Sequence, residues 1–506
     1  MTRALFLLAT LAGLWSCSSE HTYRPKPVDA GLDDVEVADT GPELDGWWTA
    51  EPDRCGPDEV RAASERYAPP GPRAELGETP RVLWTTNRIC KGGVSDKIRG
   101  ESAYGPLTID GVTEPRLAVV AYDYRGEVIE AYPELVGTLD AHTGQELHCL
   151  DLLSYETTAS PFLLLDPDAG QFFFAFETGF SRGASAFTSG PQPPPTFAPV
   201  PFQHYGTSIT TSATLALSRQ GQAVLAAGNR YLVSYDAITG ERLWVKDPLV
   251  DWDIPFIHPD PHWVWVGVYQ AAPDELLIYV TAQQRADGPK DSGLFKLDVC
   301  GQIEPVYTGL QAINVVRLSN GDHIGLVFNG GAETVALAYW KDWKIIHKVE
   351  QCSAFAVLSD ERIACLLGPS GSRRFAELQI HDFVNEPVTI PLGPPVTDFS
   401  PWVVAGAGDV LIAAGSYHDE QDDAHMVMLF ARPPYAAVEL FELEPPPGAS
   451  GWINAPPLIA PDGILYTDFA DHIFAIQTDI FGLTRSVYPR SGRGGNGNRG
   501  HVVLDP

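Results

Sequence analysis

The ten residues from Tyr235 to Trp244 read YDAITGERLW, and they indicate how the rest of the chain folds. Tyr235 and Asp236 end an alternating apolar run, and Thr239 and Gly240 follow as turn residues. An aspartate side chain can cap its own turn, and glycine readily adopts the positive φ that a tight reversal needs. The decapeptide therefore predicts a strand, a capped turn and a second strand, with Trp244 packed between adjacent sheets.

The same unit recurs along the chain. TLDAHTGQEL (138–147) repeats it closely, FKLDVCGQIE (295–304) repeats it with a cysteine before the glycine, and HIFAIQTDIFG (472–482) is a degenerate copy. Three weaker copies are TVALAYWKDWKI, FAELQIHDFVNEP and MVMLFARPPYAAVEL. The residues that define the signature are Asp140, Thr143, Gly144, Asp236, Thr239, Gly240, Trp244, Asp298 and Gly301.

The spacing of the copies predicts the number of sheets. A propeller blade of four short strands uses about 40–50 residues. The interval from Asp140 to Asp236 then fits two blades, the interval to Asp298 fits one blade with an insertion, and the interval to Gln477 fits four. We expect an all-β protein, a single β-propeller of four-stranded blades, with eight blades and seven as the alternative. Circular closure leaves only short sheet edges.

The texture of the sequence divides the chain into four parts. Residues 1–16 read as a signal peptide, and residues 17–50 as an acidic, Pro/Gly-rich disordered tether with too few apolar residues to form a core. Residues 51–80 are a transition segment with one short helix at DEVRAASERY. Short apolar runs separated by turn residues fill 81–506, which we assign to the propeller.

The N-terminus resembles a bacterial lipoprotein signal. A short basic start precedes the apolar run ALFLLATLAGLW, which is too short to span a bilayer as a stable anchor. Leu14, Ser16 and Cys17 match the family pattern, whereas Trp15 departs from the small residue usual there. The resemblance implies cleavage before Cys17 and lipidation of its thiol, with an ordinary secretory signal as the alternative. Ser18 after the cysteine implies delivery to the outer membrane.

Six further cysteines allow disulfides in an exported chain, and six permit 15 connectivities. Cys352 and Cys365 flank the turn-like sequence SDER, so we predict that they join neighbouring strands of a hairpin. Cys55 and Cys90 are further candidates with open connectivity. No Cys/His spacing fits a zinc site, and we predict no structural metal.

Charge excludes one class of partner. The chain has 34 basic and 65 acidic residues, a formal net charge of −31. Nucleic-acid binding requires basic patches that release phosphate counterions, so we predict no nucleic-acid partner.

The repeats resemble those of the β-propeller superfamily with quinoprotein-type repeats, over about residues 81–490. That superfamily includes quinone-dependent dehydrogenases and non-catalytic propellers, such as the lipoprotein subunit of the outer-membrane β-barrel assembly machinery. The dehydrogenases hold their cofactor under two adjacent cysteines and bind calcium through Asn, Glu and Asp. This chain has no Cys-Cys dipeptide and no recognisable ligand set. The resemblance therefore implies neither quinone nor calcium here, and we assign no catalytic residue.

Three stretches carry chemistry that the repeats do not explain. HDEQDDAH (418–425) has two histidines and four carboxylates, which suit a divalent cation or a solvated loop. HPDPHW (258–263) suits a ligand-binding rim or an anchored connection between blades. GPQPPPTFAPVPFQHY (190–205) suits an extended arm for a partner or a rigid insertion against the propeller.

The sequence favours a non-catalytic envelope lipoprotein whose propeller is a protein-binding scaffold. Its expected partners are other envelope proteins and, through the lipid on Cys17, the outer membrane, on either its periplasmic or its surface side. The alternative is a quinone-, calcium- or sugar-dependent enzyme, or a glycan-binding protein, that uses the central channel. A structural surface module without activity is a third possibility.

Overall fold

The structure is a computed structural model, and the chain divides into two compact units, Met1–Pro52 and Asp53–Pro506. All described residues belong to the second unit. They are 55, 80–87, 96–109, 112–123, 132–151, 162–166, 171–176, 179–182, 214–217, 221–227, 231–236, 242–257, 261, 263–272, 274–283, 290–309, 311–328, 335–368, 377–392, 398–418, 424–443, 457–469 and 472–483.

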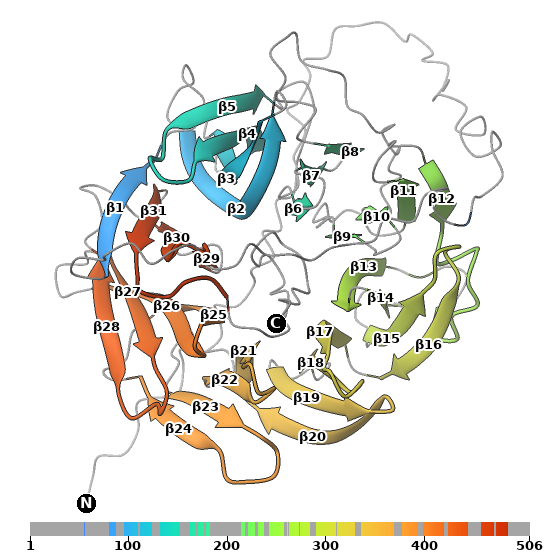
Figure 1. Ribbon diagram of the computed structural model, residues 1–506. Helices are drawn as coiled ribbons and strands as arrows, with labels where there is room; N and C mark the ends of the chain where they lie inside the picture. Colours follow the sequence, from blue (N-terminus) through green and yellow to red (C-terminus); the bar gives the residue numbers. More distant parts are fainter. Residues whose placement is uncertain are drawn as a thin grey trace, which may run out of the picture. The chain divides into compact units, whose positions relative to one another are not determined.

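These residues form eight antiparallel sheets and contain no helix (Figure 1). Seven sheets have four strands, and the second has three among the described residues. The first five sheets meet in order through their first strands: β2 (Asp96–Ile109) lies beside β6 (Phe162–Asp166), β6 beside β9 (Thr214–Leu217), β9 beside β13 (Trp263–Ala272), and β13 beside β17 (Gln311–Arg317). The predicted all-β propeller is confirmed. We number the sheets as blades 1 to 8 in chain order.

Blades 1 to 3 occupy the first half of the propeller. Their strands are β2 (Asp96–Ile109), β3 (Val112–Asp123), β4 (Tyr132–Asp140) and β5 (Glu146–Asp151); β6 (Phe162–Asp166), β7 (Gln171–Phe176) and β8 (Gly179–Arg182); and β9 (Thr214–Leu217), β10 (Gln222–Ala227), β11 (Tyr231–Asp236) and β12 (Arg242–Lys246).

Blades 4 to 6 follow without interruption. Their strands are β13 (Trp263–Ala272), β14 (Glu275–Gln283), β15 (Lys290–Leu297) and β16 (Ile303–Thr308); β17 (Gln311–Arg317), β18 (His323–Phe328), β19 (Val335–Lys341) and β20 (Lys344–Glu350); and β21 (Cys352–Val357), β22 (Ile363–Leu367), β23 (Glu377–His381) and β24 (Val388–Pro391).

Blade 8 is completed by the N-terminal strand of the propeller. Here β1 pairs with β31, with Arg81 opposite Gln477, so the two ends of the propeller sequence close one sheet. The strands of the last two blades are β25 (Asp398–Gly406), β26 (Val410–His418), β27 (Ala424–Ala431) and β28 (Val438–Leu443); and β29 (Leu458–Ile459), β30 (Ile464–Phe469), β31 (His472–Gln477) and β1 (Arg81–Thr86).

The repeat signature marks the third strand of each blade in which it occurs. Asp140 and Asp236 end β4 and β11 in blades 1 and 3. Asp298 directly follows β15 in blade 4, and Gln477 ends β31 in blade 8. The weaker copies contain β19, β23 and β27. The intervals predicted as two blades, one blade and four blades are therefore confirmed.

The core lies between blades, because each sheet is covered on both faces. Along β13, Val266 and Val268 pack toward blade 3, whereas Tyr269 and Ala271 pack toward blade 5. This is the two-residue alternation of a strand. Because both faces are buried, β14 is an almost uninterrupted apolar run with every residue buried except the last, which is half-buried.

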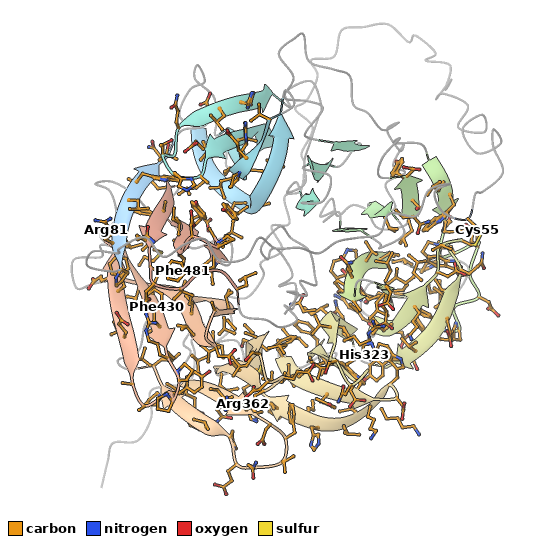
Figure 2. The ribbon with its side chains drawn as sticks, viewed as in Figure 1. Cys55, Arg81, His323, Arg362, Phe430 and Phe481 are labelled. Atoms are coloured by element: carbon orange, nitrogen blue, oxygen red, sulfur yellow. A yellow bond between two sulfur atoms is a disulfide. The ribbon has the colours of Figure 1, made fainter. Side chains whose placement is uncertain are left out.

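Two disulfides involve described cysteines. Cys352 is bonded to Cys365 across β21 and β22, with the Cα atoms 5.6 Å apart and both side chains fully buried. Cys55 is bonded to Cys300 in the turn after β15 (Figure 2).

Several predicted features lie outside the described residues. They are the signal with Cys17, the tether, the helix at 58–67, Cys90, and Thr239 with Gly240.

Candidate functional site: the two edges of the propeller

The antiparallel strands give the propeller two edges with different connections. Turns from first to second strands and from third to fourth strands lie at one edge, which we call the turn edge. Connections from second to third strands and from one blade to the next lie at the other, which we call the loop edge.

The repeat aspartates cap turns on the turn edge. Asp140 Oδ1 accepts hydrogen bonds from the backbone N–H groups of His142 and Thr143, at 3.0 and 2.8 Å. It also accepts one from the Thr143 hydroxyl at 2.8 Å. Burial opposes ionisation of Asp140, but the bonds from Thr143 and His142 outweigh it and hold the pKa of the carboxyl below its usual value. Gly144 completes the turn at φ 67°.

The turn of blade 4 is bound by the preceding blade. Trp244 Nε1 and Gln222 Nε2 of blade 3 both donate to the carbonyl oxygen of Val299, at 2.9 and 2.8 Å. Trp252, in the connection between the two blades, donates to the Gly301 carbonyl at 3.0 Å. Gly301 has φ 74°, and an added Cβ would lie 3.0 Å from the Trp244 ring. Trp244 is therefore the interblade wedge predicted from the repeat.

A matching wedge closes the ring, and sequence reasoning missed it. Trp84 on β1 of blade 8 donates to the Ala141 carbonyl in blade 1 at 3.3 Å, and the Tyr466 hydroxyl donates to the same oxygen at 2.8 Å. A Cβ on Gly144 would lie only 2.6 Å from the Trp84 ring. Trp84 precedes the first recognisable repeat by a whole blade, so no local pattern indicates its role.

Polar contacts also join blade 5 to 6, 6 to 7, 7 to 8 and 8 to 1 along the same edge. The Ser319 backbone N–H in blade 5 donates to Glu361 Oε1 in blade 6 at 2.6 Å. Ser359 in blade 6 donates to Asp409 in blade 7 from its N–H at 2.8 Å and its hydroxyl at 2.6 Å. Two further pairs are Arg432 with Asp479 at 2.6 Å, between blades 7 and 8, and His142 with Asp462 at 3.0 Å, between blades 8 and 1.

The most buried of these contacts lies between blades 4 and 5, and it was also missed. Glu275 Oε2 is 2.9 Å from His323 Nε2, and Glu275 Oε1 is 3.1 Å from Lys296 Nζ. Arg317 pairs with Asp274 and, at 3.4 Å, with Glu275. Figure 2 labels His323 in this region.

Electrostatics keeps Glu275 ionised. Burial opposes the charge, but the hydrogen bonds and positive charges of His323 and Lys296 outweigh burial and lower its pKa to about 2. The Trp343 ring stacks on His323, with centroids 4.0 Å apart. The carboxylate is thus committed to holding two blades together, and not to a ligand. In the sequence, this contact is indicated only by an isolated Glu and an isolated His, each at the start of a strand.

The loop edge receives the long connections. On the turn edge, connections between successive described strands have at most six residues, as at 382–387 and 432–437. Connections at the loop edge include 152–161 between β5 and β6, 247–262 between β12 and β13, and 444–457 between β28 and β29. Part of 247–262 reaches the turn edge, where Trp252 donates to the Gly301 carbonyl. Binding residues of rigid scaffolds concentrate on such loops.

Two of the three unexplained stretches lie in connections that start and end at the loop edge. HPDPHW lies in the β12–β13 connection. The proline-rich stretch lies between β8, which ends at the turn edge, and β9, which starts at the loop edge, so the described strands assign it to neither edge. HDEQDDAH spans the β26–β27 hairpin, which pairs up to His418 opposite Ala424. The residues between these strand ends lie outside the described part of the chain. The topology thus brings HPDPHW and HDEQDDAH, which are far apart in the sequence, to connections of the same edge.

Among the described residues, no set of three or more His, Cys, Asp and Glu side chains is arranged to hold a metal ion. In the same residues, no helix has the length and hydrophobicity needed to cross a membrane.

Solved propellers share low similarity with this chain. The C-terminal WD40 domain of Sif2 is 9% identical with a TM-score of 0.46, and the match covers 80% of this chain and 99% of that domain. The dihydro-heme d1 dehydrogenase NirN, in complex with DHE, is 14% identical with a TM-score of 0.44, over 77% of this chain and 79% of that one. No protein-family model and no curated protein matches the chain. Similarities this low carry no argument about function, and the fold assignment rests on the strand order described above.

Proposed function

We propose that this chain is an exported, lipid-anchored scaffold protein of the outer membrane that holds another envelope protein at the loop edge of its propeller. It catalyses no reaction and needs neither quinone nor calcium. The observation that supports this proposal best is the contrast between the two edges. Several described acidic side chains of the turn edge take part in turn caps and interblade bonds, whereas the HPDPHW and HDEQDDAH stretches lie in connections of the loop edge.

The test is a crosslinking pull-down from native membranes with loop-edge variants. In one variant, Asn-Gly replaces residues 419–423 between β26 and β27, because this dipeptide supports a two-residue hairpin. In a second, Gly and Ser replace His258, Pro259 and Asp260 in the β12–β13 connection. The control is Val384→Arg, since Val384 is 87% exposed on the turn edge. We expect an envelope protein enriched by the wild type to be lost from at least one loop variant and kept by the control.

Three results would contradict the proposal. Enrichment of no envelope protein over an unrelated lipoprotein would remove the scaffold role. Loss of the partner in Val384→Arg alone would place binding at the wrong edge. Quinone absorbance, or stabilisation of the purified protein by calcium, would favour an enzyme. The anchor is tested separately, because Cys17→Ala should move the protein out of the membrane fraction.

A further inference from the structure

The N-terminal region is fastened covalently to the turn edge at blade 4. Cys55 is bonded to Cys300, which lies in the turn between β15 and β16. Asp298 Oδ1 accepts the Cys300 N–H at 2.9 Å and the Gln302 N–H at 2.7 Å. The same turn also accepts the three side-chain bonds from blade 3 and Trp252 described above. Cys300 is therefore a firmly held attachment point.

The second attachment point lies on the same edge. The first residue of β1, Arg81, pairs with Gln477, the last residue of β31. A third strand ends at the turn edge, as Asp140 does in blade 1, so β1 starts at the turn edge of blade 8. Both places where the N-terminal region joins the propeller are thus on the edge opposite the long connections.

We infer that the chain enters the propeller from the turn edge, so that whatever holds the N-terminus faces the turn edge and leaves the loop edge open to a partner. This inference rests on the proposed function only for the nature of the anchor, the lipid on Cys17. As a random coil, the proposed tether of roughly 40 residues between Cys17 and Cys55 has a root-mean-square end-to-end distance of about 30–40 Å. Orientations with the turn edge toward the membrane are therefore favoured, because the opposite orientation requires the tether to extend around the propeller.

The first test is a peptide map of the purified, unreduced full-length chain. A digest should contain the peptides of Cys55 and Cys300 joined to each other. Quantitative alkylation of either cysteine without reduction, or a different partner for Cys55, would overturn the inference.

The second test measures energy transfer from the propeller to vesicles of phosphatidylethanolamine and phosphatidylglycerol with labelled headgroups. A donor is attached through an azide-bearing residue at Val384 on the turn edge, or at Thr308 on the loop edge. Both side chains are exposed. Thr308 ends β16 in blade 4, the blade that carries Cys300. Measured across the propeller face, it is therefore nearer the tether than Val384 is, and this proximity works against the expected result. The edges are about 20 Å apart, the length of a six-residue strand, and we expect about twofold higher transfer from Val384.

Two forms of attachment separate this inference from the proposed function. One chain carries its own lipid on Cys17, and in the other a deca-histidine tag replaces residues 1–17 and binds nickel-chelating lipid. Higher transfer from Val384 in the tagged chain, without vesicle binding by the untagged one, would refute the lipid anchor and support the inference. Equal or higher transfer from Thr308 in the tagged chain would overturn it. In Cys55→Ser/Cys300→Ser, transfer from both labels should fall but keep its order, because the tether then ends at Arg81.

Discussion

The Trp244 indole donates a hydrogen bond to the Val299 carbonyl at 2.9 Å, and this bond ties the outermost strand of blade 3 to the tight turn of blade 4. The ring is almost fully buried. Trp84 makes the same type of contact with Ala141 across the closing seam. The repeat signature thus describes an interblade joint, in which a capped turn receives an aromatic side chain from its neighbour.

The effects on stability of mutating Trp244 and Gln222 should be non-additive, because both side chains donate to the Val299 carbonyl. Trp244→Phe and Gln222→Met each remove one donor and leave the other, so each should lower the free energy of unfolding by about 1 kcal/mol. The double variant leaves the buried carbonyl without a donor, so its free energy of unfolding should fall by a further 1–3 kcal/mol, roughly. Denaturant unfolding of the four proteins measures the coupling, and simple additivity would argue against a shared acceptor.

Gly144 and Gly408 form a matched pair for the closing seam. Both have positive φ, 67° and 74°, so alanine at either should cost about 1 kcal/mol of backbone strain. At Gly408 an added Cβ meets nothing within 4 Å, whereas at Gly144 it would lie 2.6 Å from the Trp84 ring. We therefore expect Gly144→Ala to destabilise the protein by about 1–3 kcal/mol more than Gly408→Ala in thermal or denaturant unfolding. Equal losses would contradict the tight packing of Trp84.

Because of Glu275, the stability of the fold should depend on pH. Its pKa in the folded protein is about 2, against an ordinary value of 4.5, so its pairing with His323 and Lys296 stabilises the fold above about pH 4.5. That contribution is lost as the pH falls toward 2. Glu275→Gln should cost about 3 kcal/mol at pH 7, because it removes the buried carboxylate that both His323 and Lys296 contact.

The difference in the free energy of unfolding between Glu275→Gln and the wild type should shrink as the pH falls from 5 to 2. Glu386→Gln, at an exposed position of the turn edge, is the control and should follow the wild type throughout. A Glu275→Gln deficit that stays constant with pH would show that packing, not charge, accounts for the loss.

The Cys352–Cys365 bond should contribute to stability without affecting the anchor. It closes a loop with a sequence separation of 13 between two adjacent strands. A loop of this size restricts the unfolded chain by about 3 kcal/mol. Cys352→Ala/Cys365→Ala should lose about that amount in denaturant unfolding. Reduction of the wild type should cost more, because it also breaks the Cys55–Cys300 bond. An unchanged free energy of unfolding in the double variant would contradict a stabilising role of Cys352–Cys365.

The sequence predicted the blades better than the joints between them. The Asp140 and Asp298 caps could be predicted because donor and acceptor lie within four residues of each other, so turn chemistry alone determines them. Glu275 and His323 are 48 positions apart, and Trp84 and Ala141 are 57 apart. Nothing in either local sequence specifies the other partner.

By itself, the sequence determined the repeat, the capped turns and the alternation of strands, because backbone conformation and side-chain periodicity act over a few residues. The tertiary structure alone decided that β1 closes blade 8, that Cys55 bonds to Cys300 and that HPDPHW and HDEQDDAH belong to connections of one edge. These relationships depend on the curvature of the propeller, which brings Arg81 opposite Gln477 only when every blade between them has formed.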